Sequence, residues 1–191
     1  MGKNKSFVKL DGKPLIEIVL GKVTDIFARN PIIITNHPEE YEYLGCEMVG
    51  DIFKDKGPLG GIHTGLIYSP TLHIFIVACD MPFIEPFFIQ HMAKRLGQED
   101  VLIPHNGENV EPLHAIYSKQ CLTAIEMHLH EEHRCVQSFF QDVTINYISQ
   151  AEMVRLHLPE YYFLNVNTVE DLTKAKHCIE RVVESPHGIC Y

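Results

Sequence analysis

The chain has 191 residues, an ordinary apolar content of 46% and a net charge of −9. A chain of this length can enclose one full core, so we expect a single domain over residues 1–184 and a loose tail over 185–191. The acidic balance argues against a nucleic-acid-binding protein, which needs a basic surface. We find no apolar segment long enough to span a membrane and no signal peptide, so we expect a cytoplasmic protein that is a monomer or a weak oligomer.

Helical and strand patterns alternate along the chain, which predicts a three-layer α/β/α fold around a mostly parallel, Rossmann-like sheet. Apolar residues at helical spacing and prolines in first turns define the helices. Short β-branched or apolar runs define the strands. In chain order, the predicted elements are a helix at 14–28, a strand at 31–35, a short helix at 38–44, a strand at 46–49, a helix at 58–68, a strand at 72–78, a helix at 85–96, a strand at 101–104, an extended segment at 112–117, helices at 118–130 and 134–140, a strand at 144–148 and a closing helix at 168–183.

Asp80 is the most informative candidate for chemistry. It directly follows the apolar run that ends at Ala78 and Cys79, and Pro82 breaks the chain two residues later. Ligands of α/β proteins bind at the carboxyl ends of strands, and a carboxylate there suits a hard cation that carries phosphate oxygens. The alternative is an Asp that only initiates a turn.

Two neighbouring strands also end in polar residues, and a glycine loop follows them. Asn36 comes after the strand at 31–35 and Asp51 after the strand at 46–49. The loop Gly57-Pro-Leu-Gly-Gly61 lies directly before a helix, where glycines allow close approach of a ligand and the helix start offers free N–H groups. A Pro-opened helix with no ligand is the alternative.

Two further groups of residues need interpretation. Lys5 belongs to a locally basic start that could supply charge to a phosphate, and Asn167 lies at a strand-to-helix junction. His128, His130 and His133 suggest a metal site. On a continuous helix only His130 and His133 share a face, and glutamates flank them, so we favour a solvated polar face.

Six motifs together resemble the molybdenum cofactor guanylyltransferases (MobA-type), over roughly residues 1–176. The pair formed by the fourth and the sixth motif is the most specific. In order, the motifs are Met1-Gly-Lys-Asn-Lys5, Gly12-Lys-Pro-Leu15, Gly57-Pro-Leu-Gly-Gly61, Cys79-Asp-Met-Pro82, Glu111-Pro-Leu-His-Ala-Ile-Tyr117 and Asn165-Val-Asn-Thr168.

The resemblance implies transfer of GMP from GTP to molybdenum-bearing molybdopterin, with Mg²⁺ as the cofactor and molybdoenzyme maturation proteins as further partners. By motif, Asp80 holds the metal and Lys5 contacts GTP phosphate, and both are catalytic. The resemblance also implies binding roles for six other residues: Asn36 and Asp51 toward the guanosine, Gly57 and Gly61 in the nucleotide loop, and Arg134 and Asn167 toward the pterin.

The chain departs from the family pattern at its start. The family opens with an apolar strand, central in the sheet, and a Gly-Gly-x-Ser-x-Arg loop that cradles the triphosphate, just before the position of Met1. We therefore expect about 15–20 further in-frame codons upstream that encode a β-branched run and a glycine-pair loop. The alternative is a remnant that has lost nucleotide binding.

Two other functions stay open at this stage. One is a related nucleotidyltransferase that moves CMP to molybdopterin, or a nucleotidyl group to a sugar or alcohol phosphate. The other is a degenerate, non-catalytic paralogue that binds the pterin or a partner enzyme. Retention of Asp80, Lys5 and Asn167 argues against the second.

Overall fold

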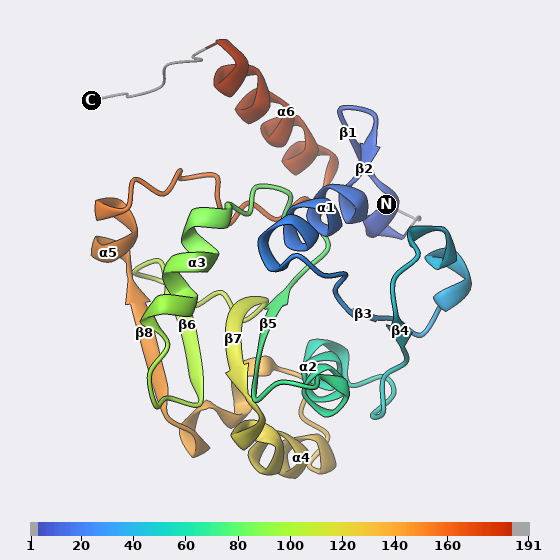
Figure 1. Ribbon diagram of the computed structural model, residues 1–191, viewed down its shortest axis with the longest axis vertical. Coiled ribbons are helices and arrows are strands. Elements are labelled where there is room, and N and C mark those ends of the chain that lie inside the picture. The colour runs from blue at the N-terminus through green and yellow to red at the C-terminus, as the bar shows by residue number, and fades with distance from the viewer. Residues whose placement is uncertain (1–3, 185–191) are drawn as a thin grey trace.

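The computed structural model of the protein describes residues 4–184, so the predicted loose tail at 185–191 lies outside the described residues (Figure 1). A four-stranded sheet has the order β5 (His73–Val77), β7 (His114–Ser118), β6 (Val101–His105) and β8 (Ile145–Ser149). β5, β6 and β8 run in the same direction, and β7 runs antiparallel to both of its neighbours. The sheet is therefore mixed, with one reversed strand in a set that is otherwise parallel.

Helices cover both faces of this sheet, which gives the predicted three layers (Figure 1). Alternate residues of a strand point to opposite faces. In β6, Val101 and Ile103 pack against α2 (Gly57–Tyr68), α4 (Leu122–His130) and the 3₁₀ segment η5 (Val136–Asp142). Leu102, between them, packs toward α3 (Pro86–Arg95) and α5 (Gln150–Arg155). The alternation of side chains along the strand thus places apolar residues in two hydrophobic cores, one on each face of the sheet.

A second, smaller sheet lies in the first part of the chain. β3 (Ile33–Ile34) and β4 (Met48–Val49) pair in parallel, apart from the larger sheet. Ahead of them are the 3₁₀ turn η1 (Lys5–Phe7), the hairpin of β1 (Lys9–Leu10) and β2 (Lys13–Pro14), and α1 (Leu15–Phe27). The closing helix α6 (Val169–Glu184) contacts β1, so it packs beside the N-terminal hairpin (Figure 1). None of the helices within residues 4–184 has both the length and the apolar composition to cross a membrane.

Several elements differ from the sequence predictions. The helices predicted at 38–44 and 134–140 are 3₁₀ segments, namely η2 (Pro38–Glu40), η3 (Glu42–Leu44) and η5, and η4 (Lys119–Cys121) precedes α4. The hairpin of β1 and β2 was not predicted, because its strands have two residues each. Its turn residues Asp11 and Gly12 both have positive φ, as a type I′ turn requires. α5 was also missed, although Ser149 accepts a hydrogen bond from the Glu152 N–H as a helix cap.

A cavity of about 640 Å³ lies between the β3–β4 sheet and the four-stranded sheet. Its walls are largely apolar and come from α1, β3, α2 and β5, and polar groups lie beyond the end of β5. Within residues 4–184, β3 pairs only with β4, and β5 pairs only with β7 among the named strands. Each therefore has a free edge, and a further strand placed between them could join the two sheets.

Candidate functional site

Asp80 lies in the turn that follows β5, as the sequence predicted. The Asp80 carbonyl accepts a 2.9 Å hydrogen bond from the Val166 N–H, which fixes this turn against the segment before α6. The Oδ1 atom of Asp80 is buried and has no hydrogen-bond partner in the described chain. Burial raises the pKa of the carboxyl, while the nearby Lys5 ammonium lowers it. Asp80 therefore offers an unused oxygen that a cation could satisfy.

Lys5 and Asn167 meet beside this carboxylate. The Lys5 Nζ donates a 2.7 Å hydrogen bond to the Asn167 Oδ1. A reciprocal cap at the start of α6 holds Asn167. The Thr168 N–H donates to the Asp171 Oδ2 at 2.9 Å, and the Asp171 N–H donates to the Thr168 hydroxyl at 3.1 Å. The same Asp171 oxygen accepts a 3.1 Å hydrogen bond from the Asn167 N–H. Asn167 and Asp80 both line the cavity, so the structure brings together three predicted residues, Lys5 and Asn167 from opposite ends of the described chain and Asp80 from its middle.

Asn36 and Asp51 form a second polar pair, at the ends of β3 and β4. The Asn36 Nδ2 donates to the Asp51 Oδ2 at 2.8 Å, and the Asp51 N–H donates to the Asn36 Oδ1 at 2.9 Å. The other carboxylate oxygen of Asp51, Oδ1, is buried without a partner. A Cβ built on Gly61 would lie 3.9 Å from this oxygen, so the pair faces the glycine segment of α2.

The segment Gly57–Gly61, predicted as a loop ahead of a helix, forms the first five residues of α2, and its glycines have different roles. Gly57, the first residue of the helix, has a φ of +61°, which glycine adopts without strain. Gly61 lines the cavity and has room around it, since the nearest atoms to an added Cβ are 3.9 Å away. Gly60 is the glycine that packing demands, because an added Cβ would lie 2.8 Å from the Phe53 carbonyl oxygen. Gly57 and Gly61 are among the predicted site residues, whereas Gly60 is not.

Arg134 lies away from Asn167. It is exposed, and its carbonyl oxygen is 3.9 Å from the position of a Cβ on Gly57. The structure therefore places Arg134 beside the start of α2, outside the set of described residues that line the cavity. Its role toward the pterin stays a prediction.

Glu111 is a cavity residue that the sequence analysis did not select. It lines the cavity with Asp80, and burial raises the pKa of its carboxyl. β7 carries it there, because His114, three residues later, pairs with Val77 at the end of β5. The signal was present in the fifth motif, where Glu111 precedes a strand, but only the pairing of β5 with β7 reveals the proximity.

Cys79 is not set up as a nucleophile. Its Sγ lies 3.1 Å from the Ser6 hydroxyl, which accepts a 3.0 Å hydrogen bond from the Tyr41 hydroxyl. Burial raises the pKa of the Cys79 thiol, so it stays protonated near neutral pH. The site therefore suits chemistry that needs charge and positioning and no covalent intermediate.

Comparison with known proteins gives a consistent result. Residues 1–148 match the MobA-like NTP transferase domain. The chain is 37% identical over 195 residues to the probable molybdenum cofactor guanylyltransferase of Peptoclostridium acidaminophilum, covering 98% of this chain and 87% of that protein. It is 33% identical over 180 residues to the molybdenum cofactor guanylyltransferase of Desulfosudis oleivorans, covering 94% and 89%. The molybdopterin-guanine dinucleotide biosynthesis protein A of Archaeoglobus fulgidus superposes with a TM-score of 0.81 at 26% identity, covering 94% of this chain and 92% of that one.

Proposed function

The chain belongs to the MobA-like NTP transferase family, and on that basis we propose that it transfers GMP from GTP to molybdenum-bearing molybdopterin, forming the guanine dinucleotide cofactor and pyrophosphate. One structural observation supports specific residues for this reaction. Asp80 presents a buried carboxylate oxygen without a partner in the cavity that Asn167 also lines, and Lys5 lies beside both.

In the proposed reaction, a terminal phosphate oxygen of the pterin attacks the α-phosphorus of GTP. A new P–O bond forms, the bond between the α- and β-phosphates breaks, and pyrophosphate leaves with the bonding electrons. Positioning and neutralisation of charge carry most of the catalysis in such transfers. Lys5 supplies a mobile positive charge for the phosphates, and its hydrogen bond to Asn167 directs the ammonium to the cavity end.

Asp80 would hold Mg²⁺, and its environment fits that role. A hard cation prefers carboxylate oxygen, and binding there would satisfy the unpartnered Oδ1 and favour the ionised carboxyl that burial otherwise disfavours. The ion would neutralise phosphate charge in the transition state. Glu111 lines the same cavity and could supply a second carboxylate.

The positions of the other predicted residues, Arg134 excepted, support roles in substrate binding. The Asn36–Asp51 pair would bind the guanosine part of GTP, with Gly57 and Gly61 at the start of α2 beside it. Asn167 would lie toward the pterin phosphate, whereas Arg134 lies outside the cavity lining and its role there stays a prediction. A cytoplasmic location, binding to maturation proteins and a monomeric or weakly oligomeric state stay predictions.

The test is formation of the guanine dinucleotide cofactor from GTP and molybdenum-bearing molybdopterin, with pyrophosphate as the coupled product. CTP run in parallel separates guanylyl from cytidylyl transfer. Turnover with CTP and none with GTP would reassign the nucleotide. GTP binding without any transfer, under the same conditions, would favour a non-catalytic paralogue.

A further inference from the structure

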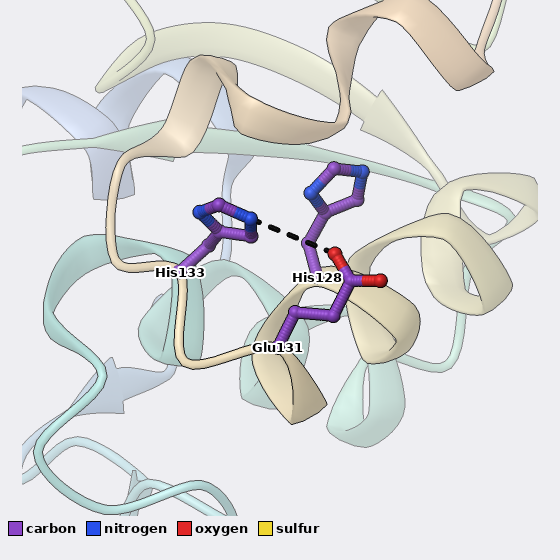
Figure 2. A group of neighbouring side chains, drawn as sticks. All are labelled: His128, Glu131 and His133. Atoms are coloured by element: carbon purple, nitrogen blue, oxygen red, sulfur yellow. Dashed lines mark ion pairs between the residues drawn. The ribbon is translucent and has the colours of Figure 1, made fainter.

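We propose that His128, Glu131 and His133 form a zinc site at the end of α4, separate from the Asp80 cavity (Figure 2). Each of the three residues offers one ligand atom, and these atoms all lie within 4.8 Å of one another. Two imidazoles and one carboxylate are a ligand set that suits Zn²⁺, with a fourth position left for water.

The end of α4 brings these residues together. The helix ends at His130, and Glu132 takes a left-handed φ of +66°. The His133 N–H then donates to the His128 carbonyl at 3.0 Å, and the Glu132 N–H donates to the Leu129 carbonyl at 3.3 Å. This pair of bonds is a Schellman motif, which folds the chain back over the last helical turn. Residues five apart thereby meet, which corrects the assumption of a continuous helix in the sequence analysis.

His128 is already oriented as a metal ligand. Its side chain is only 7% exposed, and its Nε2 lies 2.8 Å from the Asp142 Oδ2. A carboxylate only accepts hydrogen bonds, so in the neutral ring Nε2 carries the proton and Nδ1 has a free lone pair. That Nδ1 is buried and has no partner in the described chain, and the ring faces His133 (Figure 2). A histidine held by a carboxylate in this way is the usual arrangement around zinc.

Glu131 and His133 can move to complete the site. Their side chains are 59% and 50% exposed, and the His133 Nε2 lies 3.6 Å from the Glu131 Oε2. Small rotations of these free side chains would bring both to bonding distances of about 2.0–2.2 Å from one ion. His130 is excluded from the site, because its ring packs against Phe53 with centroids 5.3 Å apart.

The test is titration of the full chain with Zn²⁺ alone, in competition with a chromophoric chelator and in excess Mg²⁺. We expect one bound Zn²⁺ per chain and a melting temperature that rises with free Zn²⁺. Glu131→Gln and His133→Gln should each weaken binding at least tenfold, and the double variant should lose it. Asp142→Asn should weaken binding roughly 10–100-fold, through the orientation and basicity of His128.

The controls keep the proposal falsifiable. His130→Gln and Cys135→Ser change exposed residues outside the trio, and Asp80→Asn changes the other candidate metal site, so all three should bind Zn²⁺ as the wild type does. Melting in a chelator, where the Gln variants should match the wild type, separates loss of the ligands from loss of the fold. Equal Zn²⁺ affinity in the double variant, or loss of binding in any control, would overturn the proposal.

Discussion

Lys5 and Asn167 lie 162 residues apart in the chain, and the Lys5 ammonium donates a 2.7 Å hydrogen bond to the Asn167 side-chain oxygen. This contact joins the beginning of the described chain to the start of α6 at the end of the cavity that holds Asp80. It also sets the electrostatics of the site, because the charge of Lys5 lowers the pKa of the Asp80 carboxyl against the effect of burial.

Lys5→Gln is therefore expected to move the acid limb of the pH–rate profile to higher pH. Without the ammonium, only a backbone hydrogen bond still opposes the effect of burial on the pKa of Asp80. That pKa therefore rises further, and the ionised form that binds metal is lost earlier as the pH falls. The measurement is kcat/KM against pH for wild type and variant, and a lower kcat for the variant is also expected. Lys9→Gln, a change at an exposed lysine in β1, serves as the control. An unchanged acid limb in Lys5→Gln would separate Lys5 from Asp80.

Asp80→Asn is expected to lower turnover by several orders of magnitude while the fold stays intact. The amide keeps the shape of the carboxyl but loses the charge that holds a cation. Because burial raises the pKa of Asp80, the ionised group costs folding free energy at neutral pH. The variant should thus melt no lower than the wild type, which circular dichroism can check. Near-normal turnover in the folded variant would leave Asp80 as a turn residue only.

Two neighbouring glycines should respond differently to alanine. Gly60→Ala is expected to lower the free energy of unfolding by about 1–3 kcal/mol, because its Cβ would lie 2.8 Å from the Phe53 carbonyl. Gly61→Ala has room for a Cβ, so its stability should stay close to that of the wild type, while its KM for GTP should rise because the added methyl group narrows the cavity at the proposed nucleotide site. Chemical denaturation and steady-state kinetics of both variants provide the test. Equal stability of the two variants would contradict the packing argument.

An additional strand between β3 and β5 should stabilise the protein. Both strands have a free edge within residues 4–184, and the cavity between them has largely apolar walls. We expect that a β-branched segment with a glycine-pair loop, fused ahead of Met1, raises the melting temperature and reduces aggregation. The control is a Gly/Ser segment of equal length. Equal melting midpoints for the β-branched fusion, the control fusion and the chain alone would show that no strand enters the gap.

The elements that could be predicted from the sequence are those that depend on the local pattern of apolar and polar residues. The strand ending before Asp80 follows from an apolar run, and α1 follows from an apolar stripe with Pro14 ahead of it. Contacts between distant segments were beyond that reasoning. The approach of Glu111 to the cavity depends on β7 pairing with β5, and the meeting of His128 with His133 depends on where α4 ends. Sequence periodicity shows which face of a helix or strand a residue occupies. It does not show which distant segment packs against that face.

His114 gives a prediction about stability and pH. It is fully buried within an aromatic cluster, and burial lowers its pKa from 6.5 to about 3. Since the unfolded chain binds a proton there below about pH 6.5 and the folded protein does not, His114 contributes a stability that is complete above that pH and is lost as the pH falls toward 3. In this pH range, His114 alone lowers the free energy of unfolding by roughly 1.4 kcal/mol for each pH unit of acidification.

The double variant His114→Phe with Tyr162→Phe should remove this slope. His114 Nε2 and the Tyr162 hydroxyl share a buried 3.0 Å hydrogen bond, so replacing both avoids an orphaned polar group and keeps the aromatic packing. The measurement is the free energy of unfolding between pH 4 and pH 7 for both proteins. His37→Gln, at a side chain that is 71% exposed, should leave the wild-type slope unchanged. If the double variant loses stability toward pH 4 as steeply as the wild type, His114 is not a neutral buried residue in the folded protein.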